Sequence, residues 1–145
     1  MKRKAIFMTL LLLATVMHVS RVEAQDLKGL PQAAQEFITT YFPKLKVAKV
    51  EIDSELFESK TYEVELNNAY ELAFSSKGEW FEVDCKGEQV PLSLIPQAIQ
   101  KYIQTNFPGD YITQIERDRA GYEVELQSDL TLIFDKEGKF KKIGD

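Results

Sequence analysis

Glutamates at alternate positions of short β-type segments are the side chains of this sequence best placed to do chemistry. Glu63 and Glu65 lie in Tyr-Glu-Val-Glu-Leu (62–66), and Glu123 and Glu125 lie in the identical pentapeptide 122–126. Paired carboxylates can act as acid and base in glycoside hydrolysis. The alternation, however, places these carboxylates on the wet face of an antiparallel sheet, where we expect no pocket to raise one of their pKa values. This pattern favours binding over catalysis.

The same open face is the predicted interaction surface. An acidic face with an embedded aromatic ring could bind a basic loop of a partner by electrostatic steering and an anchor residue. The alternative is that these glutamates are the ordinary solvated side of a two-layer domain. The adjacent rings of Trp80 and Phe81 must lie on opposite faces of a strand, so one of them is partly exposed. The candidate residues are Glu63, Glu65, Glu71, Trp80, Phe81, Glu123 and Glu125.

The sequence offers few residues for nucleophilic catalysis or for binding a metal or cofactor. His18 is the only histidine, and it lies in the predicted leader described below; Cys85 is the only cysteine. Cys85 is therefore predicted to be a small buried residue, with a disulfide between chains as the alternative. The acidic clusters at 53–55 and 135–138 lack the spacing of a calcium-binding loop and are predicted to be turns. We expect no enzyme activity, no cofactor and no metal.

Residues 1–24 have the pattern of a secretory signal peptide. A basic start, Lys2-Arg3-Lys4, precedes an apolar run, and Val22-Glu23-Ala24 offers small residues at a cleavage site. The apolar run is short for a membrane span, so no stable span is expected after cleavage. The predicted location is periplasmic or secreted.

Composition narrows the class of partner. The chain has 145 residues, 44% apolar and 28% charged. Of its 18 basic residues four lie in the leader, and of its 23 acidic residues one does, so the remainder carries a net charge of −8. This charge has the wrong sign for nucleic acid. The expected partner is another envelope or secreted protein.

The remainder of the chain contains an internal sequence repeat. The segment 30–43 recurs at 95–108 with eight of fourteen positions identical, and the pentapeptides 62–66 and 122–126 are the same. The periodicity predicts a helix in each copy, ended by Pro43 and Pro108, and then four antiparallel strands. In copy one these strands are predicted at 47–53, 61–66, 70–75 and 79–84. We therefore expect a single α+β domain over 25–145, composed of repeat 1 (28–85), a connector (86–94) and repeat 2 (95–145).

These motifs resemble the PepSY-like family of exported bacterial proteins, also called putative β-lactamase-inhibitor-like. The resemblance rests on the helix motif ending in Phe-Pro, on Gly121-Tyr-Glu-Val-Glu-Leu126, and on the aromatic positions Trp80 and Phe140. It implies two helix-plus-sheet repeats that form one curved sheet with both helices on one side. For function it implies a protein-binding module, inhibitor-like towards a peptidase or another enzyme. A binder or sensor of a small cationic ligand or peptide is the alternative.

Overall fold

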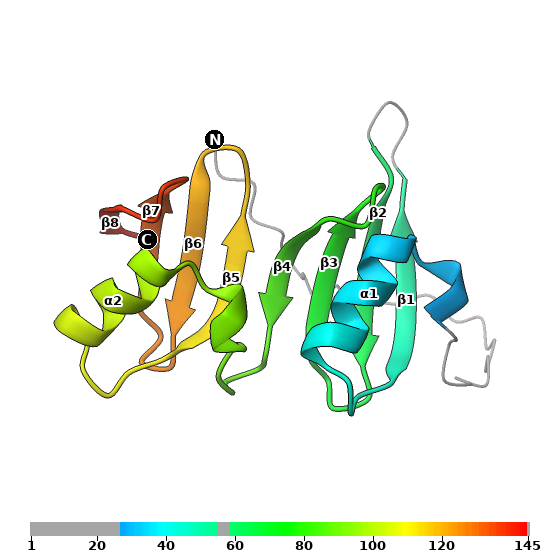
Figure 1. The fold of residues 1–145 in the computed structure, drawn as a ribbon, viewed down its shortest axis with the longest axis horizontal. Helices are drawn as coiled ribbons and strands as arrows, with labels where there is room; N and C mark the ends of the chain where they lie inside the picture. Colours follow the sequence, from blue (N-terminus) through cyan, green and yellow to red (C-terminus); the bar gives the residue numbers. More distant parts are fainter. Residues whose placement is uncertain (1–26, 55–58, 145) are drawn as a thin grey trace, which may run out of the picture.

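The computed structural model describes residues 27–54 and 59–144, so the predicted leader lies outside the described residues. Within them a short 3₁₀ turn and a helix precede four strands, and the same order then repeats (Figure 1). The first half comprises η1 (Leu27–Gly29), α1 (Gln32–Tyr41), β1 (Val47–Asp53), β2 (Thr61–Leu66), β3 (Glu71–Ser75) and β4 (Trp80–Asp84). The second half comprises η2 (Leu92–Leu94), α2 (Gln97–Asn106), β5 (Ile112–Arg117), β6 (Gly121–Leu126), β7 (Thr131–Asp135) and β8 (Phe140–Ile143).

All eight strands form one antiparallel sheet in the order of the sequence, from β1 to β8. Each strand pairs with the next, so every connection is local except the helical segment between β4 and β5. The two halves also share their irregularities. The register shifts between Val47 and Lys49 in β1, and between Ile112 and Gln114 in β5.

Both helices cover the same face of the sheet (Figure 1). Their apolar residues recur at helical spacing, so each helix presents one buried stripe to the strands. In α1 the buried residues are Ala34, Phe37 and Ile38, and in α2 they are Ile99 and Ile103. The result is two layers, helices on sheet, as the sequence predicts.

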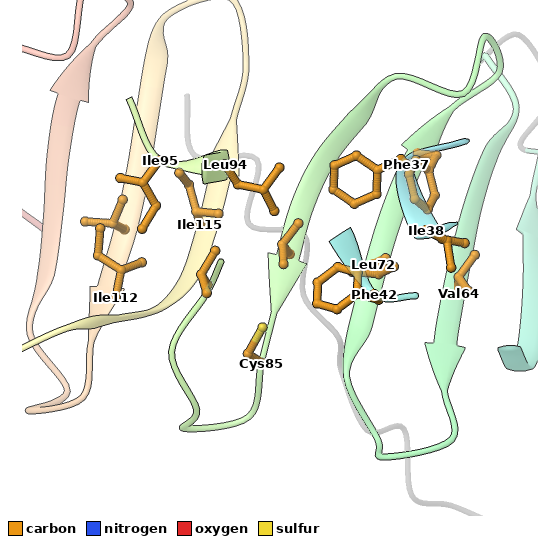
Figure 2. Packing of buried hydrophobic residues seen from close by; sticks show 14 of the residues in the cluster. Phe37, Ile38, Phe42, Val64, Leu72, Cys85, Leu94, Ile95, Ile112 and Ile115 are labelled. Atoms are coloured by element: carbon orange, nitrogen blue, oxygen red, sulfur yellow. The ribbon is translucent and has the colours of Figure 1, made fainter. Parts of the chain in front are cut away.

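One continuous hydrophobic core lies between these layers. Figure 2 shows core side chains from both halves: Val64 of β2 and Ile112 and Ile115 of β5 come from the sheet, and Phe37 comes from α1. Leu94 of η2 lies between these two groups, so the segment that connects β4 to α2 helps to join the two parts of the core.

Cys85 belongs to this core. Its side chain is 0% exposed and makes no disulfide, and burial raises the pKa of its thiol to about 12. This is the small buried residue predicted from the sequence. A disulfide between chains would require the strand end to open.

The predicted elements agree closely with the observed ones. The strands at 47–53 and 61–66 have the predicted bounds, while β3 and β4 each begin one residue later. The α+β class and the single antiparallel sheet with two helices are therefore confirmed.

A pair of glycine substitutions tests the tightest point of the sheet. Gly121 has a φ of +144°, and a Cβ there would lie 2.2 Å from the carbonyl oxygen of Phe134. Gly109 also has a positive φ, +85°, but a Cβ there would meet nothing within 4 Å. We expect Gly109→Ala to lower the free energy of unfolding by about 1–2 kcal/mol, from backbone strain alone. Gly121→Ala should lower it by at least about 2 kcal/mol more, because it adds a steric clash. Urea denaturation measures both values, and equal losses would contradict the observed packing.

Candidate functional site

The face opposite the helices carries acidic side chains in two rows that run across the strands. Strand register defines both rows, because directly paired residues on neighbouring strands share a face. The central row consists of Glu51, Glu63, Glu82, Glu116 and Glu123, with Ala73 between the second and third. The flanking row consists of Glu65, Glu71, Asp84 and Glu125, with Gln114 between the last two.

The alternation of each strand fixes which side chains lie on this face. In β2, Tyr62, Val64 and Leu66 are buried in the core under α1, so Glu63 and Glu65 must point the other way. The same reasoning holds for Glu123 and Glu125 around the buried Val124. The structure therefore brings the sequence-predicted glutamates together on one face.

Glu82 occupies the middle of the central row and is only 1% exposed. Its Oε1 accepts a hydrogen bond of 3.1 Å from Nε2 of Gln114, which also donates to Oε1 of Glu116 at 3.0 Å. Its other oxygen, Oε2, is buried without a hydrogen-bond partner among the described residues. A buried carboxyl with an unpaired oxygen is costly in its charged form.

The pKa values of the central pair reflect this burial. Loss of solvent, reinforced by the nearby carboxylates of Glu116, Asp84, Glu71 and Glu63, raises the pKa of Glu82 to about 8. Burial, together with Glu123, Asp118, Glu125 and Asp84, raises the pKa of Glu116 to about 7. The expectation that no group on this face would have a raised pKa is therefore wrong. Glu82 differs from the exposed glutamates of this face in being 1% exposed and in bonding to Gln114 of the neighbouring strand β5.

Two predicted glutamates share the same environment to a smaller degree. Burial, with the charges of Glu51, Asp53 and Glu71, raises the pKa of Glu63. Burial, with Asp84, Asp129 and Glu123, raises the pKa of Glu125. The acidic face thus holds its negative charges close enough to oppose one another's ionisation.

Lys86 neutralises part of the flanking row. Its Nζ lies 2.6 Å from Oε2 of Glu71 and 2.8 Å from Oδ2 of Asp84. Glu71, predicted as a binding residue, is therefore already paired within the chain. The central row is the more strongly acidic part of the face.

The two candidate aromatic residues lie differently. Trp80 is half-buried on the helix side, 6.0 Å from the ring of Phe37, and the guanidinium of Arg117 lies 4.0 Å from its ring centroid. It has the packing role that its alignment with Phe140 indicates, and it is not part of the acidic face. Phe81 is the extra residue of a β-bulge opposite Ala73 and Phe74. It is half-buried, and it does not belong to the hydrophobic cluster.

Sequence reasoning missed Glu82, Gln114 and Glu116. The missing information was the pairing of β4 with β5, which joins residues of the two halves and follows from no local pattern. One signal for Glu116 was present in the sequence. Glu116 lies 65 residues after Glu51, the same offset that relates the two helices, so the two glutamates occupy equivalent positions in the two copies.

Metal binding has no preformed site in the described part of the chain. Residues 27–54 and 59–144 contain no group of three or more His, Cys, Asp or Glu side chains placed to hold a metal ion. Within the same residues, neither helix is long and apolar enough to span a membrane.

The α+β architecture described above is shared with known proteins. The chain belongs to the PepSY-like family described as putative β-lactamase-inhibitor-like, which matches residues 17–72 and 60–142. No match is found among the curated proteins.

Three solved structures of similar proteins come from Bacteroides species. A putative periplasmic protein of unknown function from Bacteroides vulgatus is 45% identical with a TM-score of 0.80, over 83% of this chain and 96% of that one. A putative calcium-regulated periplasmic protein from Bacteroides thetaiotaomicron is 40% identical with a TM-score of 0.78, over 83% and 94%. A putative periplasmic protein of the DUF2874 family from Bacteroides vulgatus is 37% identical with a TM-score of 0.77, over 88% and 99%.

The raised pKa values give the stability of this protein a defined pH dependence. Above the ordinary pKa of a glutamate and below about pH 8, the folded chain binds more protons at Glu82 than the unfolded chain. The free energy of unfolding should therefore fall as pH rises through this window. Because a tenfold change in an equilibrium corresponds to about 1.4 kcal/mol, the fall should reach a few kcal/mol.

Glu82→Gln should remove much of this fall and stabilise the protein at pH 8, since an amide carries no charge. Urea denaturation from pH 5 to pH 9 measures the effect. The matched control is Glu137→Gln, whose side chain is 67% exposed, and it should keep the original slope. An unchanged slope in Glu82→Gln would show that Glu82 ionises normally in the folded protein.

Proposed function

We propose that this chain is an exported, non-enzymatic binding module whose acidic sheet face holds a positively charged surface of another envelope or secreted protein. The observation that carries the proposal is the central row, in which five glutamates lie in register across β1 to β6. A cationic partner would stabilise the ionised forms of these crowded carboxylates. An inhibitor-like role towards an enzyme is the form of binding that the family description supports.

The extent of the row favours a protein over a small ligand. Six strands about 4.8 Å apart span on the order of 24 Å from the first glutamate to the last. A small cation or a short peptide, the alternative occupant, would cover only part of this width. A basic protein surface could meet the whole row.

The burial of Glu82 argues against catalysis at this face. A side chain that is 1% exposed cannot touch a substrate, and Gln114 already bonds both carboxyls of the central pair. Once ionised, as its raised pKa allows near pH 8, it would still attract a cation bound above it. We therefore assign the face a binding role.

The fold itself is best explained by duplication of one helix-plus-four-strand unit. The two halves repeat the order of their elements and the position of the register shift in their first strands. Descent from a common unit would account for both similarities. The periplasmic descriptions of the related structures support the location predicted from the leader.

Charge reversal on the acidic face tests the proposed function. Glu63, Glu65, Glu123 and Glu125 are changed together to Lys, and binding of a hexa-arginine peptide is measured by calorimetry. The original protein should bind the peptide more tightly at pH 8 than at pH 5, because its central pair ionises over this range. The variant should lose at least tenfold in affinity. In a pull-down from envelope extract, the original protein should also retain a partner protein that the variant does not retain.

The matched control reverses four exposed acids away from this face, Glu36, Glu79, Glu88 and Glu137. An equal loss of affinity in the control would mean that net charge, not the acidic face, determines binding. A calcium titration belongs in the same experiment, because one similar protein is described as calcium-regulated. If the original protein binds calcium but not the peptide, and the fourfold lysine variant binds neither, then calcium and not a protein is the occupant of this face.

A further inference from the structure

Each of the two edge strands of the sheet carries one exposed large hydrophobic side chain. β1 and β8 lie at opposite ends of the strand order and at opposite ends of the sheet in Figure 1. Each has one side of its backbone without a neighbouring strand. Among the described residues the exposed large hydrophobic side chains are Ile52 at 53%, Leu92 at 51% and Ile143 at 56%. Two of these three lie on the edge strands.

The chain already contains a template for joining such edges. β4 ends the first half and pairs with β5, the first strand of the second half, in the register Glu82–Glu116, Val83–Ile115 and Asp84–Gln114. β8 is the counterpart of β4 because it too is the fourth strand of a half and follows the same kind of bulge. β1 is the counterpart of β5 because both are first strands with the same register shift.

We propose that β8 of one copy of this chain pairs antiparallel with β1 of a second copy, in the register of the β4–β5 pair. Counting from the shared bulges, Lys142 takes the place of Glu82 and Ile143 that of Val83, while Glu51 takes the place of Glu116 and Val50 that of Ile115. The exposed Ile143 then packs beside Val50, as Val83 packs beside Ile115 within the chain. The sheets of successive copies become continuous.

Charge supports this pairing over that of two β8 strands. At the internal joint the paired residues are two glutamates, whereas between copies the same position would pair Lys142 with Glu51. Two β8 strands would instead bring Lys141 and Lys142 close to the same lysines of the other copy. Two β1 strands paired about Ile52 would place Glu51 opposite Asp53, whereas pairing about Val50 would place Lys49 opposite Glu51, its partner within the chain. Since like charges directly opposite one another are destabilising, β8–β8 pairing is disfavoured, and of the remaining arrangements only the head-to-tail one follows the β4–β5 template.

The geometry determines the kind of assembly. The interface uses two different surfaces of the chain, so each added copy leaves a free β1 and a free β8. The contact is a few residues long, and we therefore expect association that grows with concentration rather than a fixed dimer. The central rows of acidic residues then align from one copy to the next.

Sedimentation velocity of the purified protein, from about 10 μM to about 1 mM, measures the association. The average mass should rise with concentration, and the rise should weaken in high salt. Glu51→Lys and Lys142→Glu should each reduce the association constant at least tenfold. The double variant carrying both changes should regain it, because the pair is restored in reversed order. Lys136→Glu, an exposed change in the turn before β8, is the control and should associate like the original chain.

Cysteine crosslinking tests the register directly. Residues paired across an antiparallel ladder lie within the Cα separation that a disulfide spans. An equal mixture of Glu51→Cys and Lys142→Cys should give a crosslinked heterodimer under mild oxidation, in excess of either variant alone. The native Cys85 is buried and should not compete. Circular dichroism confirms that each variant is folded.

A protein that stays monomeric up to about 1 mM overturns the proposal, as does a double variant that fails to regain association. Crosslinking of either variant with itself, in preference to the mixture, would show symmetric edge pairing and also overturn it. Peptide binding by the acidic face is measured on dilute monomer, so it stands or falls independently of these results.

Discussion

The backbone pairing between β4 and β5 is the constraint on which the rest of this structure depends. Each half alone would offer one helix on four strands, a thin core for its length. The pairing, extended by hydrogen bonds from the Cys85 amide to Thr113 and from the Val90 amide to Ile112, merges the two cores. Arg117 crosses the joint, since its Nε donates to the Trp80 carbonyl at 2.7 Å while its guanidinium lies over the Trp80 ring. Val83 and Ile115 are fully buried as a result.

The same pairing creates the chemistry of the opposite face. Because side chains alternate, the register that places Val83 beside Ile115 in the core must place Glu82 beside Glu116 on the other side. Gln114 reduces the repulsion by donating to both carboxyls, yet one oxygen of Glu82 stays unpartnered among the described residues. The same strand register therefore buries Val83 and Ile115 and brings two carboxyl groups close together. A bound cation would relieve their repulsion without disturbing the core.

The division between what could and could not be predicted from the sequence follows from the range of each interaction. Helix and strand positions depend on local periodicity, so the stripe of Ala34, Phe37 and Ile38 and the alternation around Val64 sufficed. The predicted binding glutamates lie together for the same reason. The burial of Glu82 depends on contact between strands of different halves, which no local pattern specifies.

A β-bulge explains why Trp80 does not lie on the acidic face. Strict alternation puts Trp80, Glu82 and Asp84 on one face, but the irregular pairing opposite Phe74 returns Trp80 to the helix side. Trp80 then packs against Phe37 and leaves Phe81 as the extra residue of the strand. A bulge is visible in the structure as a shift in register, whereas in the sequence it is only a second aromatic residue beside Trp80.

The charges at the joint and at the free edges differ in a way that their surroundings explain. Within the chain the buried contact of Val83 with Ile115, and a covalent connection through η2, hold two glutamates side by side despite their repulsion. Between copies neither a shared core nor a connection exists. An edge that is to pair must then supply its own attraction, and Lys142 opposite Glu51 would do so. If β8 carried a glutamate at the position equivalent to Glu82, that glutamate would repel Glu51 of the next copy. Lys142 at this position instead allows the sheet of one copy to continue into the next.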